Sequence, residues 1–175
     1  MKKLLFSLLA VSSIFASDLN LEITNETLAG NLNLNLPKNE NFQIRGTYLY
    51  YDNENKNNYY SVGVGAIGEN ALDNYNSKLT IFIDYEHTKD NSALPIGIGV
   101  FNKNFGNFQH PLFAKAEIAY APKVLSFDEA TKFLKAKVEL GIKPIKNAKL
   151  FIGYKTISFN KNYLSVGYAG IGFMF

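Results

Sequence analysis

The sequence predicts an all-β protein, a closed antiparallel transmembrane β-barrel of about ten strands, with eight strands as the alternative. Three observations lead to this prediction. Apolar and polar residues alternate with a period of two along most of the 175-residue chain. After the first 16 residues no apolar run reaches the length that a membrane-spanning helix needs. A closed barrel is the other structure that pairs every backbone polar group inside a bilayer.

The N-terminal residues have the three parts of a secretory signal peptide. Lys2 and Lys3 form a short basic region, an apolar run extends from Leu4 to Phe15, and small residues surround Ala16. We expect cleavage after Ala16, or after Ser17 as the alternative, so that residues 17–175 form a single barrel domain. A retained membrane anchor is the other interpretation, although a spanning helix needs about 20 apolar residues.

Charge and composition exclude several classes of protein. Without Lys2 and Lys3 the chain has 16 basic side chains (18 minus 2) against 15 acidic ones, so it lacks the basic excess of a nucleic-acid-binding protein. It contains no cysteine, which excludes disulfides and thiolate metal sites. We expect no cofactor and no bound metal.

Ten segments show the alternation and are separated by polar or proline-containing connections. We expect strands at residues 19–23, 31–36, 42–50, 60–66, 79–86, 96–101, 114–120, 134–143, 150–155 and 163–175. If the segments before Pro37 do not cross the membrane, the barrel has eight strands. In the connection at residues 121–132 we expect one helical turn, because Ser126 and Glu129 have capping-box spacing.

One face of nearly every expected strand is apolar, and the opposite face carries charged residues. A Lys or Arg facing lipid at the bilayer midplane would cost about 2–4 kcal/mol, so the charged face should point into the lumen. In a barrel this small, opposite charges should pair and fill the lumen. The predicted lumen charge network comprises Glu22, Arg45, Asp84, Glu86, Lys115, Glu117, Lys135, Lys137, Glu139 and Lys155, with Lys143 as a further inward lysine.

Aromatic residues collect near the two ends of the expected strands and predict two aromatic girdles. One would contain Tyr48, Tyr50, Tyr59, Tyr60 and Tyr85, and the other Phe42, Phe173 and Phe175. The alternative is a soluble β-sandwich or lipocalin-like barrel, whose apolar face would be inside and whose charged face would be solvated. The girdles favour the membrane protein.

The last eight residues resemble the C-terminal assembly signal of bacterial outer-membrane β-barrel proteins. Tyr168, Gly170, Phe173 and Phe175 carry this resemblance. It implies a Gram-negative outer membrane, with the membrane lipid and the barrel-assembly machinery as partners. We expect this strand to close the barrel against the strand that begins near Leu19, and we expect a monomer that binds no nucleic acid.

A second resemblance concerns Tyr120-Ala-Pro followed by Leu125-Ser126, and the later Gly153-Tyr-Lys155. These segments resemble the YfaZ family of small bacterial outer-membrane proteins. The Asn-Leu alternation of residues 31–36 and the segment 48–52 fit that family loosely. The resemblance implies a porin-like barrel, and it brings no catalytic residues.

The dinucleotide-binding fingerprint is matched by Gly63-Val-Gly-Ala-Ile-Gly68. That motif requires a helix directly after it, whose N-terminus binds the pyrophosphate. The residues that follow, 69–76, are rich in asparagine and have no apolar helical period. We therefore interpret these glycines as small residues packed inside a narrow barrel.

The sequence predicts a structural or interaction role for a membrane barrel with a narrow, charge-filled lumen and no catalytic site. One alternative is a narrow, weakly selective channel. The other is a lipid-modifying hydrolase at the rim that uses His87, with Ser92 and Asp90 close in sequence. Because Asp84 has the opposite phase on its strand, we do not expect it to orient His87 as a catalytic base. His110 is expected in a connection.

Overall fold

The computed structural model describes residues 17–36, 39–52, 57–69, 77–105, 111–160 and 162–175. The predicted signal peptide and His110 therefore lie outside the described residues. The described elements, in chain order, are β1 (Ser17–Ile23), β2 (Thr27–Leu36), β3 (Asn39–Tyr51), β4 (Tyr59–Glu69), β5 (Ser77–His87), β6 (Asn91–Ala93), β7 (Ile96–Phe105), β8 (Leu112–Ala121), the short 3-10 helix η1 (Lys123–Leu125), β9 (Ser126–Asp128), β10 (Phe133–Ile145), β11 (Ala148–Phe159) and β12 (Asn162–Met174). No helix among these elements is long and apolar enough to span a membrane.

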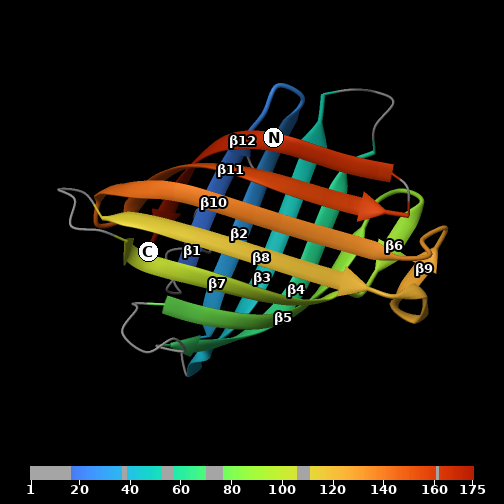
Figure 1. Cartoon of the computed structure of the whole chain (residues 1–175), viewed down its shortest axis with the longest axis horizontal. Coiled ribbons are helices and arrows are strands. Elements are labelled where there is room, and N and C mark those ends of the chain that lie inside the picture. Colours follow the sequence, from blue (N-terminus) through green and yellow to red (C-terminus); the bar gives the residue numbers. More distant parts are fainter. Residues whose placement is uncertain (1–16, 37–38, 53–56, 70–76, 106–110, 161) are drawn as a thin grey trace.

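Ten of the strands form one closed antiparallel barrel (Figure 1). The strand order is β4-β3-β2-β1-β12-β11-β10-β8-β7-β5, and β4 pairs with β5 to close the ring. The first and last strands are neighbours, with Asp18 opposite Met174 and Ile23 opposite Ala169. The predicted ten-stranded barrel is confirmed, and the eight-stranded alternative is wrong.

The two ends of the barrel differ in how they are covered. We call the end at which β1 begins and β12 finishes the proximal end, and the opposite end the distal end. In Figure 1 the distal end, with β6 and β9, is on the right, and the C-terminus is on the left. Residues 88–95 and 122–132, here called the distal cap, contain β6, η1 and β9 and extend the sheet beyond β5.

The distal cap is held by backbone hydrogen bonds between its two segments. Leu94 donates its N–H to the Leu125 carbonyl at 2.8 Å, and Glu129 donates to the Asp90 carbonyl at 3.2 Å. The connection at residues 121–132 contains one helical turn, as predicted, but the expected capping by Ser126 is wrong: η1 follows Pro122, and Ser126 is the first residue of β9. Pairing with β6 gives residues 126–128 ladder hydrogen bonds that one helical turn could not supply.

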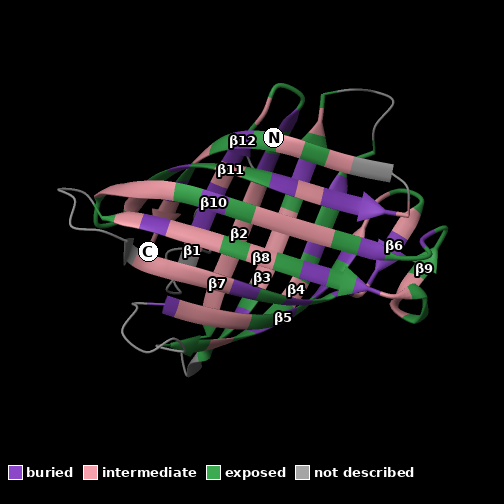
Figure 2. Ribbon diagram, viewed as in Figure 1, coloured by how far each residue is buried: buried purple, intermediate pink, exposed green. Residues whose placement is uncertain are grey.

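The outer face of the barrel is apolar. Figure 2 shows bands of exposed, intermediate and buried residues along the front strands. In β5, exposed and buried residues alternate one by one from Ile81 to Glu86, as expected for a period of two. In the ten barrel strands, every Asp, Glu, Lys and Arg whose side chain the structure describes has the strand phase that faces the lumen. The exposed aliphatic residues include Val62, Val64, Ile81, Ile83, Ile96, Ile98, Ile118, Val138, Leu140 and Ile152. The soluble alternative with an apolar interior is therefore wrong.

Tyrosines mark the distal rim of this apolar face. Tyr48, Tyr50, Tyr60 and Tyr85 point outward and are 36–51% exposed, as expected of an aromatic girdle. Tyr59 was predicted in the same girdle, and that prediction is wrong. It is 3% exposed and faces the lumen, because neighbouring residues of a strand point to opposite sides. At the proximal rim, Phe42 and Phe175 are both about half exposed.

Candidate functional site

Inward-facing side chains fill the lumen in three layers. The distal apolar layer lies under the distal cap and consists of Ala29, Leu49, Tyr59, Ala93, Ala121, Ala130, Phe133, Ile157 and Phe159. The central charge network occupies the middle of the barrel. The proximal aromatic layer consists of Phe101, Phe113, Phe151 and Tyr168. The candidate site is the lumen that these layers enclose.

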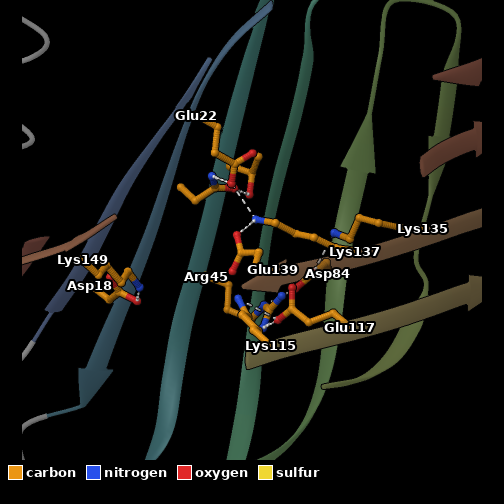
Figure 3. Close-up of polar contacts among 12 residues, drawn as sticks. Asp18, Glu22, Arg45, Asp84, Lys115, Glu117, Lys135, Lys137, Glu139 and Lys149 are labelled. Carbon is orange, nitrogen blue, oxygen red and sulfur yellow. Dashed lines mark hydrogen bonds and ion pairs between the residues drawn. The ribbon is translucent and has the colours of Figure 1, made fainter. Parts of the chain in front are cut away.

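The first cluster of the central charge network is centred on Glu22 of β1 (Figure 3). Its carboxylate accepts hydrogen bonds from Lys137 Nζ at 2.6 Å, Lys155 Nζ at 2.9 Å and Asn31 Nδ2 at 2.6 Å. Lys137 also pairs with Glu139 at 3.0 Å. The two lysines and two glutamates balance one another, so this cluster carries no net charge.

The second cluster is centred on Arg45 of β3. Its guanidinium lies 3.0 Å from Glu117 and 3.3 Å from Asp84, and its Cζ is 3.9 Å from the centroid of the Phe82 ring. Because the planar guanidinium can stack on an aromatic face and still donate from its edge, one residue joins β3, β5 and β8.

Lysines and a tyrosine complete the second cluster. Lys115 lies 3.3 Å from Glu117. Lys135 lies 3.2 Å from Asp84 and also pairs with Glu86. The fully buried Glu86 accepts a further hydrogen bond from the Tyr59 hydroxyl, which explains why that tyrosine faces inward. Arg45 and the two lysines balance three carboxylates, so the second cluster is also neutral.

Little space remains between the two clusters. A polar cavity of about 40 Å³ lies among them and is lined by side chains of both, together with Asn20, Asn33, Thr47 and Ser61. Since a water molecule needs roughly 10–15 Å³ by this measure, the cavity has room for a few waters and for no larger solute.

Apolar layers close both ends of the charged region. In the distal apolar layer, the Phe133 and Phe159 rings pack edge to face with centroids 4.7 Å apart. In the proximal aromatic layer, the Phe113 ring lies 5.7 Å from Phe101 and 6.5 Å from Phe151. Within the described residues, apolar and aromatic side chains thus pack together on both sides of the central charge network.

The predicted lumen residues all occupy inward positions, and the structure brings them together as the two clusters described above. Lys143 also points inward, but it lies near the proximal end and outside both clusters. The prediction named the charges without their partners and missed several polar partners: Asn31, Tyr59, Tyr168 and the pair of Asp18 with Lys149, 2.7 Å apart. Strand phase was the available signal for all four.

The residues of the C-terminal assembly signal divide between the two faces of β12. Phe173 and Phe175 share the outward phase. Tyr168 faces the lumen, where its hydroxyl donates to Glu139 at 3.0 Å. A side chain at Gly170 would collide with the Phe151 ring across the strand pair. Recognition by the assembly machinery stays a prediction.

The glycine motif lies within β4 and not before a helix. Gly63 and Gly65 face the lumen, where a Cβ at Gly63 would overlap the Asp84 carboxylate and lie 2.6 Å from Asp84 Cα. Close approach of the second cluster to the β4 backbone thus accounts for a small residue here. The dinucleotide interpretation has no structural basis in this strand.

His87 lies at the distal rim on the outward side, away from Asp84. Its Nδ1 is 2.9 Å from Ser92 Oγ, and Ser92 Oγ is 2.5 Å from Asp128 Oδ2. An ionised carboxylate only accepts, so the Ser92 hydroxyl donates to Asp128 and His87 donates to Ser92. A histidine that activates a serine must instead accept its proton. The hydrolase alternative stays a prediction, and this order of hydrogen bonds does not favour it.

The closed barrel, the apolar outer face and the tyrosine rim together define the class: an integral β-barrel membrane protein with a fold that fits the bacterial outer membrane. No family model matches the chain, so the YfaZ resemblance stays a prediction. No curated protein matches it either.

Three solved structures are similar to the chain. One is a KdgM porin, with 9% sequence identity, a TM-score of 0.49, and coverage of 91% of this chain and 98% of that one. A KdgM porin in complex with disordered oligogalacturonate has 10% identity, a TM-score of 0.47, and coverage of 91% and 99%. A bacterial polysaccharide outer membrane secretin has 8% identity, a TM-score of 0.44, and coverage of 85% and 56%. At identities this low, the similarity concerns general architecture and not what the chain binds.

Proposed function

We propose that this protein is an outer-membrane barrel whose lumen is closed at rest and which has a structural or interaction role without catalysis. The observation that supports the proposal is the filling of the lumen: two neutral ion-pair clusters between two apolar layers, with a cavity of about 40 Å³. A solute would have to separate buried ion pairs to pass. Removing one partner of such a pair typically costs about 3–5 kcal/mol, so thermal fluctuations seldom open the path.

An interaction role would use the distal cap. Val124 is 81% exposed and Phe127 is 48% exposed, and both belong to the cap and not to the barrel wall. Exposed apolar side chains on an ordered segment are a common feature of contact surfaces. The cap is also tied to its surroundings, since Asn57 donates to Asp90 at 3.1 Å and Asn160 donates to the Glu129 carbonyl at 2.7 Å.

The test is the conductance of the purified full chain in a planar lipid bilayer. A closed lumen predicts no step-like currents above those of the lipid alone across about ±100 mV. Correct insertion is checked by the heat-dependent shift of the folded barrel on a gel. Discrete openings of the unmodified protein would refute the closed-lumen proposal.

A second candidate is a conduit that opens when the distal cap moves. The observation that favours it is the origin of the distal apolar layer, because Ala93 and Ala130 come from the cap and not from barrel strands. We would compare Phe133→Ala combined with Phe159→Ala, which thins this layer, with the exposed control Phe127→Ala. Currents in the double variant alone would support a gate at this layer. The absence of currents in both variants would count against a gate at this layer.

A further inference from the structure

The proximal mouth of the lumen has more positive charge than the described residues neutralise. Four inward lysines from neighbouring strands gather there, Lys78 of β5, Lys103 of β7, Lys143 of β10 and Lys149 of β11, here called the proximal basic cluster. The described carboxylates that face them are Asp18 and Glu69. Four positive charges against two negative ones leave an excess of two. Each cluster of the central charge network is neutral, so this imbalance is specific to the mouth.

Among the described residues, two of the four lysines have an ion pair. Lys149 Nζ lies 2.7 Å from Asp18 Oδ2, and Figure 3 shows this pair apart from the central charge network. Lys78 pairs with Glu69 across β4 and β5. Among the described residues, neither Lys103 nor Lys143 lies within ion-pair distance of a carboxylate. The Lys143 ammonium is repelled by Lys103, Lys149 and Lys78 and attracted by the Asp18 carboxylate.

Aromatic rings form the floor beneath these ammonium groups. Lys143 Nζ lies 5.5 Å from the centroid of the Phe101 ring, and Lys149 Nζ lies 5.8 Å from Phe113 and 6.0 Å from Phe151. Such contacts hold an ammonium group in place, but they supply no counter-charge. The proximal aromatic layer also stops the mouth from continuing into the lumen. The proximal basic cluster therefore lies over an apolar layer of aromatic rings.

We propose that the proximal basic cluster binds a soluble ligand with closely spaced oxyanion groups, of the phosphate type, through Lys103 and Lys143. A lysine ammonium binds phosphate as a point charge and donates charge-assisted hydrogen bonds to it. Two unpaired ammonium groups match a ligand that carries about two negative charges. The four lysines occupy inward positions of their strands, so the ligand reaches them from solution and not from the surrounding lipid. The proposal does not depend on whether the lumen conducts.

The test uses inorganic pyrophosphate as the probe and the full chain in a neutral detergent. Isothermal titration should show saturable binding with one site per chain, and added salt should weaken it. Lys103→Met and Lys143→Met should each weaken binding by about tenfold or more, as expected for loss of a hydrogen bond between charged groups. The matched controls are Lys89→Met and Lys132→Met, which remove the same charge from exposed positions in the distal cap.

Three outcomes would overturn the proposal. One is the absence of saturable binding by the folded wild-type chain. Another is an equal weakening of pyrophosphate binding by the distal controls, which would mean that the net charge of the protein, and not the proximal basic cluster, attracts the anion. The third separates the two possible sources of phosphate: if vesicles containing phosphatidylglycerol protect Lys103 and Lys143 from amine modification but pyrophosphate does not, the partner is a lipid headgroup. The heat-dependent gel shift verifies that each variant is folded.

Discussion

The central charge network and the proximal basic cluster are built from the same residue types on many of the same strands, yet they differ in charge balance. The network has five basic and five acidic side chains, and each of its two clusters is neutral. The cluster at the mouth has four lysines and two carboxylates. In the first region the protein satisfies its own charges, whereas in the second the described residues leave two positive charges without an ion pair.

Position along the strand explains why both arrangements are tolerated. In the middle of the barrel the cavity has room for a few waters at most, so an unpaired charge is poorly solvated and each ammonium group needs a carboxylate. At the mouth, Lys78 is about a quarter exposed, and water can solvate a charge that the protein leaves unpaired. An inward charge near the mouth is therefore available to a ligand, whereas an inward charge in the middle belongs to the central charge network that fills the lumen.

Removing one lysine from each region tests whether the two regions contribute differently to stability. Lys137→Met leaves Glu22 and Glu139 with one basic partner fewer in a buried site, and should lower the free energy of unfolding by about 3–5 kcal/mol. Lys103→Met removes a charge that has no ion pair among the described residues and that is repelled by Lys78 and attracted by Glu69. It should change the stability by less than about 1 kcal/mol.

Guanidinium unfolding of the two variants in lipid vesicles, followed by the gel shift, measures both free energies. A shift of similar size in both variants would show that the two regions are equally coupled to stability. The central charge network and the proximal basic cluster would then not differ in their contribution to stability. Recovery of stability by Lys137→Arg, which keeps the charge, would confirm that the Lys137 effect is electrostatic.

Two glycines test how tightly the central charge network is packed against the wall. Gly63→Ala places a Cβ against the Asp84 carboxylate and the Ile83 carbonyl oxygen, so strands β4 and β5 must move apart. We expect a loss of about 1–3 kcal/mol, the usual cost of overpacking. Gly46→Ala is the matched control, because a Cβ there meets nothing within 4 Å. Equal midpoints of thermal unfolding for Gly63→Ala and Gly46→Ala would mean that the central charge network can move to accommodate the added Cβ.

Strand phase carried most of what the sequence could predict. The alternation identified ten strands, the apolar outer face and the ten inward charges, because lipid on one side and a narrow lumen on the other leave little choice. Phase could not assign partners, since Arg45 meets Glu117 across 72 positions of sequence and only barrel closure brings them together. The misplaced Tyr59 shows a local limit: residue type suggested a girdle, but its phase, opposite to that of Tyr60, places it inside.

The distal cap was beyond the sequence pattern for a different physical reason. β6 and β9 have three residues each, too short for an alternation to be visible. They are stabilised by each other and by the end of β5. Ser126 and Glu129 have the spacing of a helix cap, but Ser126 pairs with β6 as part of β9 instead. The excess of lysine at the proximal mouth was present in the sequence, but only the strand register shows which lysines share one end.

Tyr168 contacts both regions, and its substitution is expected to change the free energy of unfolding least. Its hydroxyl donates to Glu139 in the central charge network, while its ring packs against Phe151 of the proximal aromatic layer with centroids 6.3 Å apart. Tyr168→Phe keeps the ring and removes the hydrogen bond. Glu139 retains Lys137 at 3.0 Å, so the loss should be about 1 kcal/mol, measured by guanidinium unfolding.

The matched control for this variant is Tyr154→Phe, since Tyr154 points outward and is 51% exposed, so removal of its hydroxyl should leave the stability nearly unchanged. Pyrophosphate binding separates the two roles of Tyr168. Because the ring stays in place, Tyr168→Phe should bind pyrophosphate like wild type while unfolding more easily. A parallel loss of binding would mean that the central network positions the lysines of the mouth, and the two regions would then be a single coupled unit.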